Sequence, residues 1–288
     1  MVENGQTDDD ELTYNFRLAW DATDSVNFYA SVATGFKATS WNMSRDSRPF
    51  AADIGALQAA GLGVANLIPG TRFAGPEEAT VYELGMKAQW DRVRLNVAIF
   101  DQSIEGFQSN AFIGTGFNLA NAGEQSTEGI EFDLTYYPTD SLQLKLAGTF
   151  LDPIYDSFEG AGRDPMTGAV VDLSGQTPGG ITETSLSASM NYSFQIGDND
   201  AYFRADYFYE DDTPIGDLAI AQFIRSSDNL NLALGMSTPS GWSYSAWVRN
   251  LTDHVSLISA FPSVAQDGSF SGYRTQPRTY GVTLRKDF

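Results

Sequence analysis

Apolar and polar residues alternate along much of this chain, and the alternation predicts β-strands. In 186–196 every second residue is apolar, from Leu186 to Ile196, and serine, asparagine and glutamine lie between them. The segments 229–236 and 142–147 follow the same rule. Because successive side chains of a strand point to opposite faces, each strand has one apolar and one polar face. The three- and four-residue spacing of an amphipathic helix is absent from these segments.

This pattern predicts about eleven strands. They cover 11–21, 25–37, 78–90, 92–105, 124–138, 141–155, 182–196, 200–212, 227–238, 241–251 and 277–288. We therefore assign the chain to the all-β class, as an antiparallel up-and-down meander that occupies residues 1–288 as one unit.

The connections between these strands alternate strictly between short and long. The short ones are turn-like, at 21–24, 91–92, 138–140, 197–200 and 239–241, and the long ones are 38–77, 106–123, 156–181, 213–226 and 252–276. Bacterial outer-membrane barrels combine short periplasmic turns with long extracellular loops. The first and last predicted strands then run in the same direction, toward the short turns. Because single-chain bacterial barrels have an even number of strands, the odd count predicts half of a barrel of about 22 strands.

The composition agrees with a membrane barrel and excludes several other classes. The net charge of −20 argues against binding to nucleic acid, because such binding requires cations that neutralise phosphates. With no cysteine, neither a disulfide nor a thiolate metal site can form. No apolar run reaches the length of a transmembrane helix, but a barrel strand exposes only every second residue to lipid. The polar, acidic start does not resemble the signal peptide that an exported barrel requires, so we expect a removed or an incomplete N-terminus.

The last strand carries the most specific signal. Tyr280, Val282, Leu284 and the terminal Phe288 share one face, and a segment reading RNLTD lies upstream at 249–253. This order, RNLTD, a long loop and then PRTYGVTL with a final phenylalanine, resembles the C-terminus of TonB-dependent outer-membrane receptors. Lys286 departs from the resemblance, because it is a cation on the apolar face of the strand.

Three further segments resemble the barrel repeats of the same family, in the same order along the chain. They are GFK at 35–37, PE at 76–77 followed by YELGMK at 82–87, and NAG at 121–123 followed by EGIEF at 128–132. Each motif is short, but together with the C-terminus they cover nearly the whole chain. We interpret the glycines within them, Gly35, Gly85 and Gly129, as allowing twist or close packing of strands rather than touching a ligand.

The resemblance implies a receptor in the bacterial outer membrane that takes up a scarce nutrient of the siderophore, cobalamin or glycan class, and not an enzyme. It implies contact with outer-membrane lipid and with the barrel assembly machinery, which would read Tyr280, Gly281, Val282, Leu284 and Phe288. Contact with the TonB complex would run through a plug domain that these residues do not include. It implies no cofactor.

Candidate ligand-binding residues lie in the first two long loops. They are Trp41, Arg45, Arg48, Arg72, Phe112 and Phe117. Arginine offers a planar fork to carboxylate or catecholate oxygens, and the aromatic rings offer a stacking surface. We expect a polar interior formed by Lys37, Glu83, Lys87, Glu131, Asp133, Arg204, Asp206, Arg249 and Arg285. We expect an aromatic girdle formed by Tyr14, Trp20, Phe28, Trp90, Tyr136, Tyr192, Tyr207 and Trp242.

Other chemistry has little support in the sequence. His254 is the only histidine, so a site with several histidines is impossible, and we expect it to be a solvated loop residue. The acidic runs 8–11 and 210–212 lack the spacing of a calcium loop and favour solvated rims. Two alternatives remain open: a pore-type or two-chain outer-membrane barrel, and a soluble acidic β-sandwich that acts as a binding module.

Overall fold

The computed structural model describes residues 6–43, 73–112, 117–121, 123–163, 170–264, 266 and 268–287. Eleven strands form one sheet. These strands are β1 (Asn15–Thr23), β2 (Val26–Lys37), β5 (Glu77–Gln89), β6 (Val93–Glu105), β9 (Glu124–Thr139), β10 (Leu142–Ser157), β13 (Thr184–Ile196), β14 (Asn199–Pro214), β15 (Ile224–Ser237), β16 (Trp242–Arg249) and β19 (Thr279–Lys286). Each coincides with a predicted strand to within about four residues.

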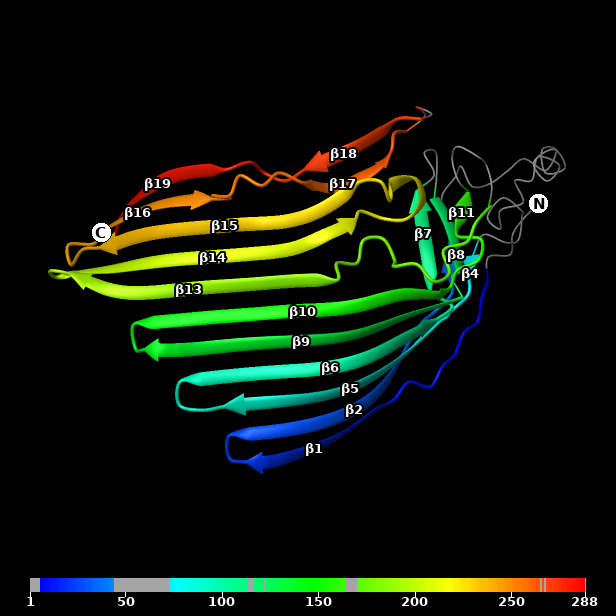
Figure 1. Ribbon diagram of the computed structural model, residues 1–288, viewed down its shortest axis with the longest axis horizontal. Coiled ribbons are helices and arrows are strands. Elements are labelled where there is room, and N and C mark those ends of the chain that lie inside the picture. The colour runs from blue at the N-terminus through cyan, green and yellow to red at the C-terminus, as the bar shows by residue number, and fades with distance from the viewer. Residues whose placement is uncertain are drawn as a thin grey trace.

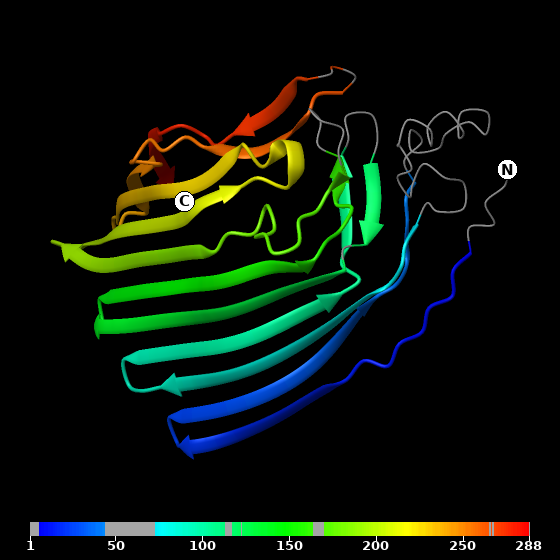
Figure 2. The same cartoon turned by 45° about the vertical axis from the view of Figure 1, so that its right-hand side comes forward.

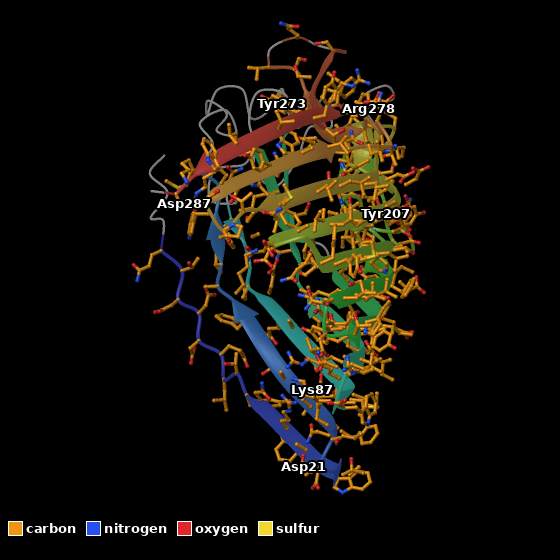
Figure 3. All side chains as sticks on the ribbon, turned by 90° about the vertical axis from the view of Figure 1, so that its left-hand side faces the viewer. Asp21, Lys87, Tyr207, Tyr273, Arg278 and Asp287 are labelled. Carbon is orange, nitrogen blue, oxygen red and sulfur yellow. The ribbon has the colours of Figure 1, made fainter. Side chains whose placement is uncertain are left out.

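The sheet is an antiparallel meander, as predicted. Its spatial order follows the order of the strands along the chain, from β1 to β19. All short turns lie at one end, where the C-terminus also lies, and the long connections lie at the other (Figure 1). Strands β1 and β19 are the two edges and do not pair with each other, which confirms the expected open sheet. Seen along the strands, the sheet is an arc whose first and last strands are far apart (Figure 3).

The long connections contain four small hairpins that the alternation did not predict. They are β3 (Ser40–Trp41) with β4 (Phe73–Ala74), β7 (Gln108–Phe112) with β8 (Phe117–Asn121), β11 (Gly162–Arg163) with β12 (Val170–Val171), and β17 (Leu257–Pro262) with β18 (Phe270–Arg274). A single 3-10 turn, η3 (Leu218–Ile220), completes the described elements. Within the described residues, no helix has both the length and the apolar character needed to span a membrane.

The two faces of the sheet differ in chemistry, as the alternation requires. One row of cross-strand neighbours on the apolar face consists of Leu18, Ala30, Leu84, Ile99, Ile130 and Phe150. Leu18 is 67% exposed and Leu84 55%, although both are aliphatic. Tyr207, from the same face, lies on the convex side of the arc (Figure 3). Exposed aliphatic residues on a convex face are typical of contact with lipid, whereas a sandwich would bury them.

The apolar face ends in an acidic row toward the long loops. In the next row of neighbours, Tyr82 faces Asp101, Asp101 faces Glu128, and Glu128 faces Asp152. Carboxylates that face lipid at the centre of a bilayer are costly, and the cost falls toward the interface. The acidic row therefore lies at or beyond the outer boundary of the lipid-facing band.

Aromatic rings cover glycines on neighbouring strands at five places in the sheet. The paired residues are Tyr29 and Gly85, Phe100 and Gly129, Phe132 and Gly148, Tyr202 and Gly235, and Trp247 and Gly281. A Cβ atom at Gly129 would lie 2.3 Å from the ring of Phe100, and one at Gly85 would lie 2.2 Å from that of Tyr29. The packing interpretation of Gly85 and Gly129 is therefore confirmed.

This packing makes Gly129→Val a sharp test. We expect the substitution to lower the free energy of unfolding by about 1–3 kcal/mol, because the added side chain must displace the Phe100 ring. The measurement is the urea midpoint of the complete barrel in detergent. Gly35→Ala is the matched control, since its Cβ would meet only Ala79, at 3.6 Å. Equal midpoints for both variants would contradict the packing role.

The RNLTD segment forms a hydrogen-bonded clasp around Asn250, which is 3% exposed and has a φ of 52°. Its Nδ2 donates to the carbonyl oxygens of His254 at 2.8 Å and Gln276 at 3.0 Å. Its Oδ1 accepts from the backbone N–H of His254 and the hydroxyl of Thr252, both at 3.1 Å. One side chain therefore holds the start of the last long loop against the segment that leads into β19.

A second contact joins the same two motifs. The backbone N–H of Arg278 donates to Oδ1 of Asp253 at 3.0 Å, and its guanidinium donates to the carbonyl oxygen of Leu251 at 3.2 Å. His254 is half-buried, with Nε2 3.4 Å from Oγ of Ser226. The expectation of a solvated histidine was therefore wrong, because the clasp draws this residue against β15.

Lys286, the departure from the family pattern, lies at the short-turn end of the apolar face. Its register partner is Trp242, and its Nζ lies 5.4 Å from the centroid of that ring. The ammonium also donates to the carbonyl oxygen of Ser240 in the adjoining turn. A lysine at a membrane boundary can bury its stem and keep its charge in the polar layer, so this position is compatible with lipid contact below it.

Candidate ligand-binding mouth

The ends of β5, β6 and β9 that lie toward the long loops are joined by side chains from two family motifs. Asn121 accepts a hydrogen bond from the backbone N–H of Gly75 at 2.7 Å and donates to the carbonyl oxygen of Gly75 at 3.1 Å. Its Nδ2 also donates to the carbonyl oxygen of Gly106. Gly106 has a φ of +66°, and a Cβ there would meet the carbonyl oxygen of Pro76 at 2.6 Å. The PE and NAG motifs therefore meet in space and hold the rim of the barrel wall.

Glu77 and Gln108 extend this network into the wall. The Oε1 atom of Glu77 accepts from Nζ of Lys37 at 3.2 Å and from the backbone N–H of Gln108. The Glu77 side chain is 13% exposed and that of Lys37 54%, so the pair is only partly screened by water. The charge of Lys37 is thereby balanced within the wall.

A cavity of about 470 Å³ lies beside this network, and we call it the mouth pocket. Its lining comes from the end of β2, the β3 strand and the β7–β8 hairpin, and consists of Lys37, Ser40, Trp41, Asn42, Met43, Gln108, Asn110 and Leu119. The hairpins that carry it stand at the long-loop end of the sheet (Figure 2). The Trp41 indole packs at 5.3 Å from the Phe73 ring and donates from Nε1 to Oγ1 of Thr7 at 3.3 Å.

The predicted ligand-binding residues meet this pocket only in part. Trp41 lines it. Phe112 and Phe117, the candidates from the second long loop, are register partners at the end of the β7–β8 ladder, so their backbones lie together. Arg45, Arg48 and Arg72, and the possible helix at 51–65, lie outside the described residues. The sequence analysis did not single out Gln108, Asn42 or Asn110, because carboxamides in a loop carry no distinctive pattern.

A small apolar core supports the mouth on the side of β10. Tyr155, Phe158, Ala161 and Leu173 are buried together. The hydroxyl of Tyr155 donates to Oδ2 of Asp217 at 2.9 Å, and Oδ1 of Asp217 accepts from the backbone N–H of Gly179 at 2.7 Å. Hydrogen bonds from the Ser174 hydroxyl and backbone N–H lower the pKa of the exposed Asp172 carboxyl nearby. The loops after β10 and β14 thus form one packed platform.

The polar face carries cations that lie on aromatic rings. The guanidinium of Arg17 lies 4.0 Å from the Tyr29 centroid, and Nζ of Lys87 lies 5.6 Å from it. Arg249 lies in the same way over Trp247, at 5.1 Å. All five residues lie on the face opposite the apolar rows, and two of them, Lys87 and Arg249, were expected in the polar interior.

The described residues contain no group of three or more acidic or histidine side chains that could hold a metal ion. The acidic runs 8–11 and 210–212, which were considered for calcium, both lie within these described residues.

Comparison with known protein families matches residues 2–251 to a family described as TonB dependent receptor-like, β-barrel. Among solved structures, the chain is similar to the ferric yersiniabactin uptake receptor FyuA from Yersinia pestis, with a TM-score of 0.71 and 17% identity, covering 99% of this chain and 38% of that one. It is also similar to the siderophore receptor PiuA from Acinetobacter baumannii, with a TM-score of 0.65 and 20% identity, covering 94% and 35%. At identities this low, the TM-scores show a shared fold alone, and the chain spans well under half the length of either receptor.

Proposed function

Because this chain belongs to the TonB-dependent receptor-like β-barrel family, whose members are transporters of the Gram-negative outer membrane and not enzymes, we propose that it forms the C-terminal half of a nutrient receptor barrel. The observation that carries the proposal is the open eleven-stranded meander whose long loops all lie at one end. Residues 1–288 form one part of that barrel in this proposal.

The direction of the edge strands supports a larger barrel. Strands β1 and β19 both run toward the short turns, so direct closure would pair them in parallel. If two copies of this chain were placed side by side, β1 of one copy would pair with β19 of the other, and these pairs would also be parallel. A second set with an odd number of strands can close the barrel. If both of its edge strands run opposite to β1 and β19, every pair in the barrel is antiparallel. The unpaired edge groups need such a second set, because they would be costly in lipid.

The proposed partners follow from this arrangement. Outer-membrane lipid covers the apolar face, and the barrel assembly machinery recognises the last strand. TonB contacts a plug domain inside the barrel, and that plug faces the polar side where Arg17, Lys87 and Arg249 lie. A small nutrient of the siderophore, cobalamin or glycan class enters at the mouth.

The test is energised uptake by the complete receptor in cells. The probes are ⁵⁵Fe-citrate, labelled cobalamin and labelled maltohexaose, each measured with functional TonB and in a strain that lacks it. We expect at least one probe to enter only when TonB is functional. Entry that is equal in both strains would support the pore-type alternative, and a barrel assembled from two separately encoded halves would support the two-chain alternative.

The arginines of the first long loop belong to the same test. We propose that Arg45, Arg48 and Arg72 hold anionic groups of the ligand, with Trp41, Phe112 and Phe117 supplying rings. Replacing the three arginines with alanine should then lower uptake of an anionic probe about tenfold or more. Heat-modifiability on gels checks that the barrel is folded. Unchanged uptake by a folded barrel would remove the arginines from the site.

A further inference from the structure

A groove of about 900 Å³ lies on the apolar face of the sheet, across β1, β2, β5, β6, β9 and β10, and we call it the outer-wall groove. The small residues of β2 explain why it is hollow. Ala30 lies between Leu18 and Leu84 in the register, and Val32 occupies the equivalent place one row farther toward the long loops. Leu18 and Leu84 are both more than half exposed, so they stand out from the sheet on either side of Ala30. The groove therefore offers room for an extended apolar chain.

The acidic row lies at the end of the outer-wall groove that faces the long loops. Asp101, Glu128 and Asp152 all line the groove and are exposed. Within the part of the chain that the structure describes, no lysine or arginine pairs with them. The basic residues of the same six strands all alternate onto the opposite face, and they are Arg17, Lys37, Lys87, Arg94 and Lys145. The apolar groove thus ends in negative charge that the protein does not compensate.

This combination restricts what can occupy the groove. Lipid covers the apolar face in the proposed barrel, so an acyl chain fills the groove and the headgroup of that lipid lies at the acidic row. A headgroup whose only charge is a phosphate would face like charges at short range, which is unfavourable. A divalent cation could bridge phosphate and carboxylates, but no group of three or more acidic side chains among the described residues could hold a metal ion. A primary ammonium needs no such convergence, because its three N–H donors can each meet a single carboxylate.

We propose that the outer-wall groove binds an outer-leaflet lipid whose headgroup carries a primary amine. The acyl chain lies over Ala30, and the ammonium donates to the carboxylates of Asp101, Glu128 and Asp152. The inference rests on the proposed receptor barrel and adds a lipid class that the receptor selects at its wall. Lipid that merely covers an apolar face would show no such preference, so the preference for an amine is the quantity to measure.

The test is native mass spectrometry of the complete receptor in detergent, which counts the lipid molecules that stay bound. The probes are phosphatidylethanolamine and phosphatidylglycerol with identical chains, at equal concentration, with EDTA or with Mg²⁺. We expect the wild type in EDTA to retain phosphatidylethanolamine about tenfold more than phosphatidylglycerol. The combined variant Asp101→Asn, Glu128→Gln and Asp152→Asn should lose this preference. Ala30→Phe, which fills the groove, should lower the retention of phosphatidylethanolamine to that of phosphatidylglycerol.

Each variant has a matched control on the same face of the sheet. Glu78→Gln, Glu105→Gln and Glu124→Gln together remove the same charge from three exposed residues that lie two rows farther toward the long loops and do not line the groove. Ala205→Phe adds the same bulk on β14, between Met190 and Leu232. Both controls should keep the wild-type preference.

Three results would overturn the proposal. They are equal retention of the two lipids by the wild type, a preference that survives in both groove variants, and a preference for phosphatidylglycerol that appears only with Mg²⁺, which would assign the acidic row to a bridging cation. Heat-modifiability on gels checks that each variant is folded. Because the assay requires neither TonB nor uptake, a failure of energised transport would leave its result intact, and the reverse also holds.

Discussion

Replacing Asn250 with alanine should lower the free energy of unfolding of the complete barrel by about 2–4 kcal/mol. The reason is that four hydrogen bonds converge on one buried side chain, and alanine would leave the carbonyl oxygens of His254 and Gln276 without their donor. Alanine is also disfavoured at the φ of 52° that Asn250 adopts. The measurement is the urea midpoint of the folded barrel in detergent or lipid.

Two variants separate the causes. Asn250→Gly restores the freedom of the backbone but not the hydrogen bonds, so it should recover only a small part of the loss. Asn199→Ala is the matched control, because among the described residues the Asn199 side chain makes one hydrogen bond, from Nδ2 to the carbonyl oxygen of Ile196, at a turn. It should cost no more than about 1 kcal/mol. A loss as small as this for Asn250→Ala would show that the clasp does not stabilise the barrel.

Deleting Phe288 should reduce the abundance of the receptor in the outer membrane much more than Phe288→Tyr does. The last strand pairs with β16 over eight residues, and its exposed Tyr280, Val282 and Leu284 prolong the apolar face toward the C-terminus. If the assembly machinery reads a terminal aromatic, removal of the ring blocks insertion, whereas tyrosine keeps it. Quantitative immunoblots of isolated outer membranes measure the difference.

The competing view is that Phe288 only contributes buried apolar surface. In that case its deletion would cost about 1.5–3 kcal/mol of stability and insertion would proceed normally. The two views differ in which quantity changes, so the thermal stability of the inserted fraction is measured on the same samples. Normal abundance with a lowered melting temperature would remove Phe288 from the assembly signal.

The eleven main strands were predictable because each has a long alternating pattern, and lipid on one side preserves that pattern without interruption. Strand β13, for example, alternates from Leu186 to Ile196 without an exception. Because short turns and long loops alternate, the odd number of strands makes the first and last strands run in the same direction. We therefore expected these two strands not to pair with each other, which leaves the sheet open. Strict alternation is a physical consequence of a wall with lipid on one face and a polar interior on the other.

The small hairpins and the mouth were not predictable in the same way. Strand β3 has two residues and β7 has five, which is too short for a period of two to be recognised. The motif residues Asn121 and Asn250 came to attention through resemblance, but their hydrogen bonds join segments far apart along the chain. The side chain of Gln108 donates a hydrogen bond to the carbonyl oxygen of Ala38, which is 70 residues away in the sequence. No local sequence pattern predicts such a contact.

The height of the acidic row formed by Asp101, Glu128 and Asp152 determines whether a ligand first contacts the barrel in water or in the lipid headgroup layer. Strands β9 and β10 each have 16 residues, or about 53 Å at 3.3 Å per residue, and a tilt of about 40° leaves a wall roughly 40 Å high. The lipid-facing band of such barrels is about 25 Å tall. A rim on the order of 15 Å therefore projects into the external medium, beyond the carboxylates. Recognition at that height takes place in water, so it is governed by ionic strength and by competing solutes rather than by the composition of the surrounding lipid.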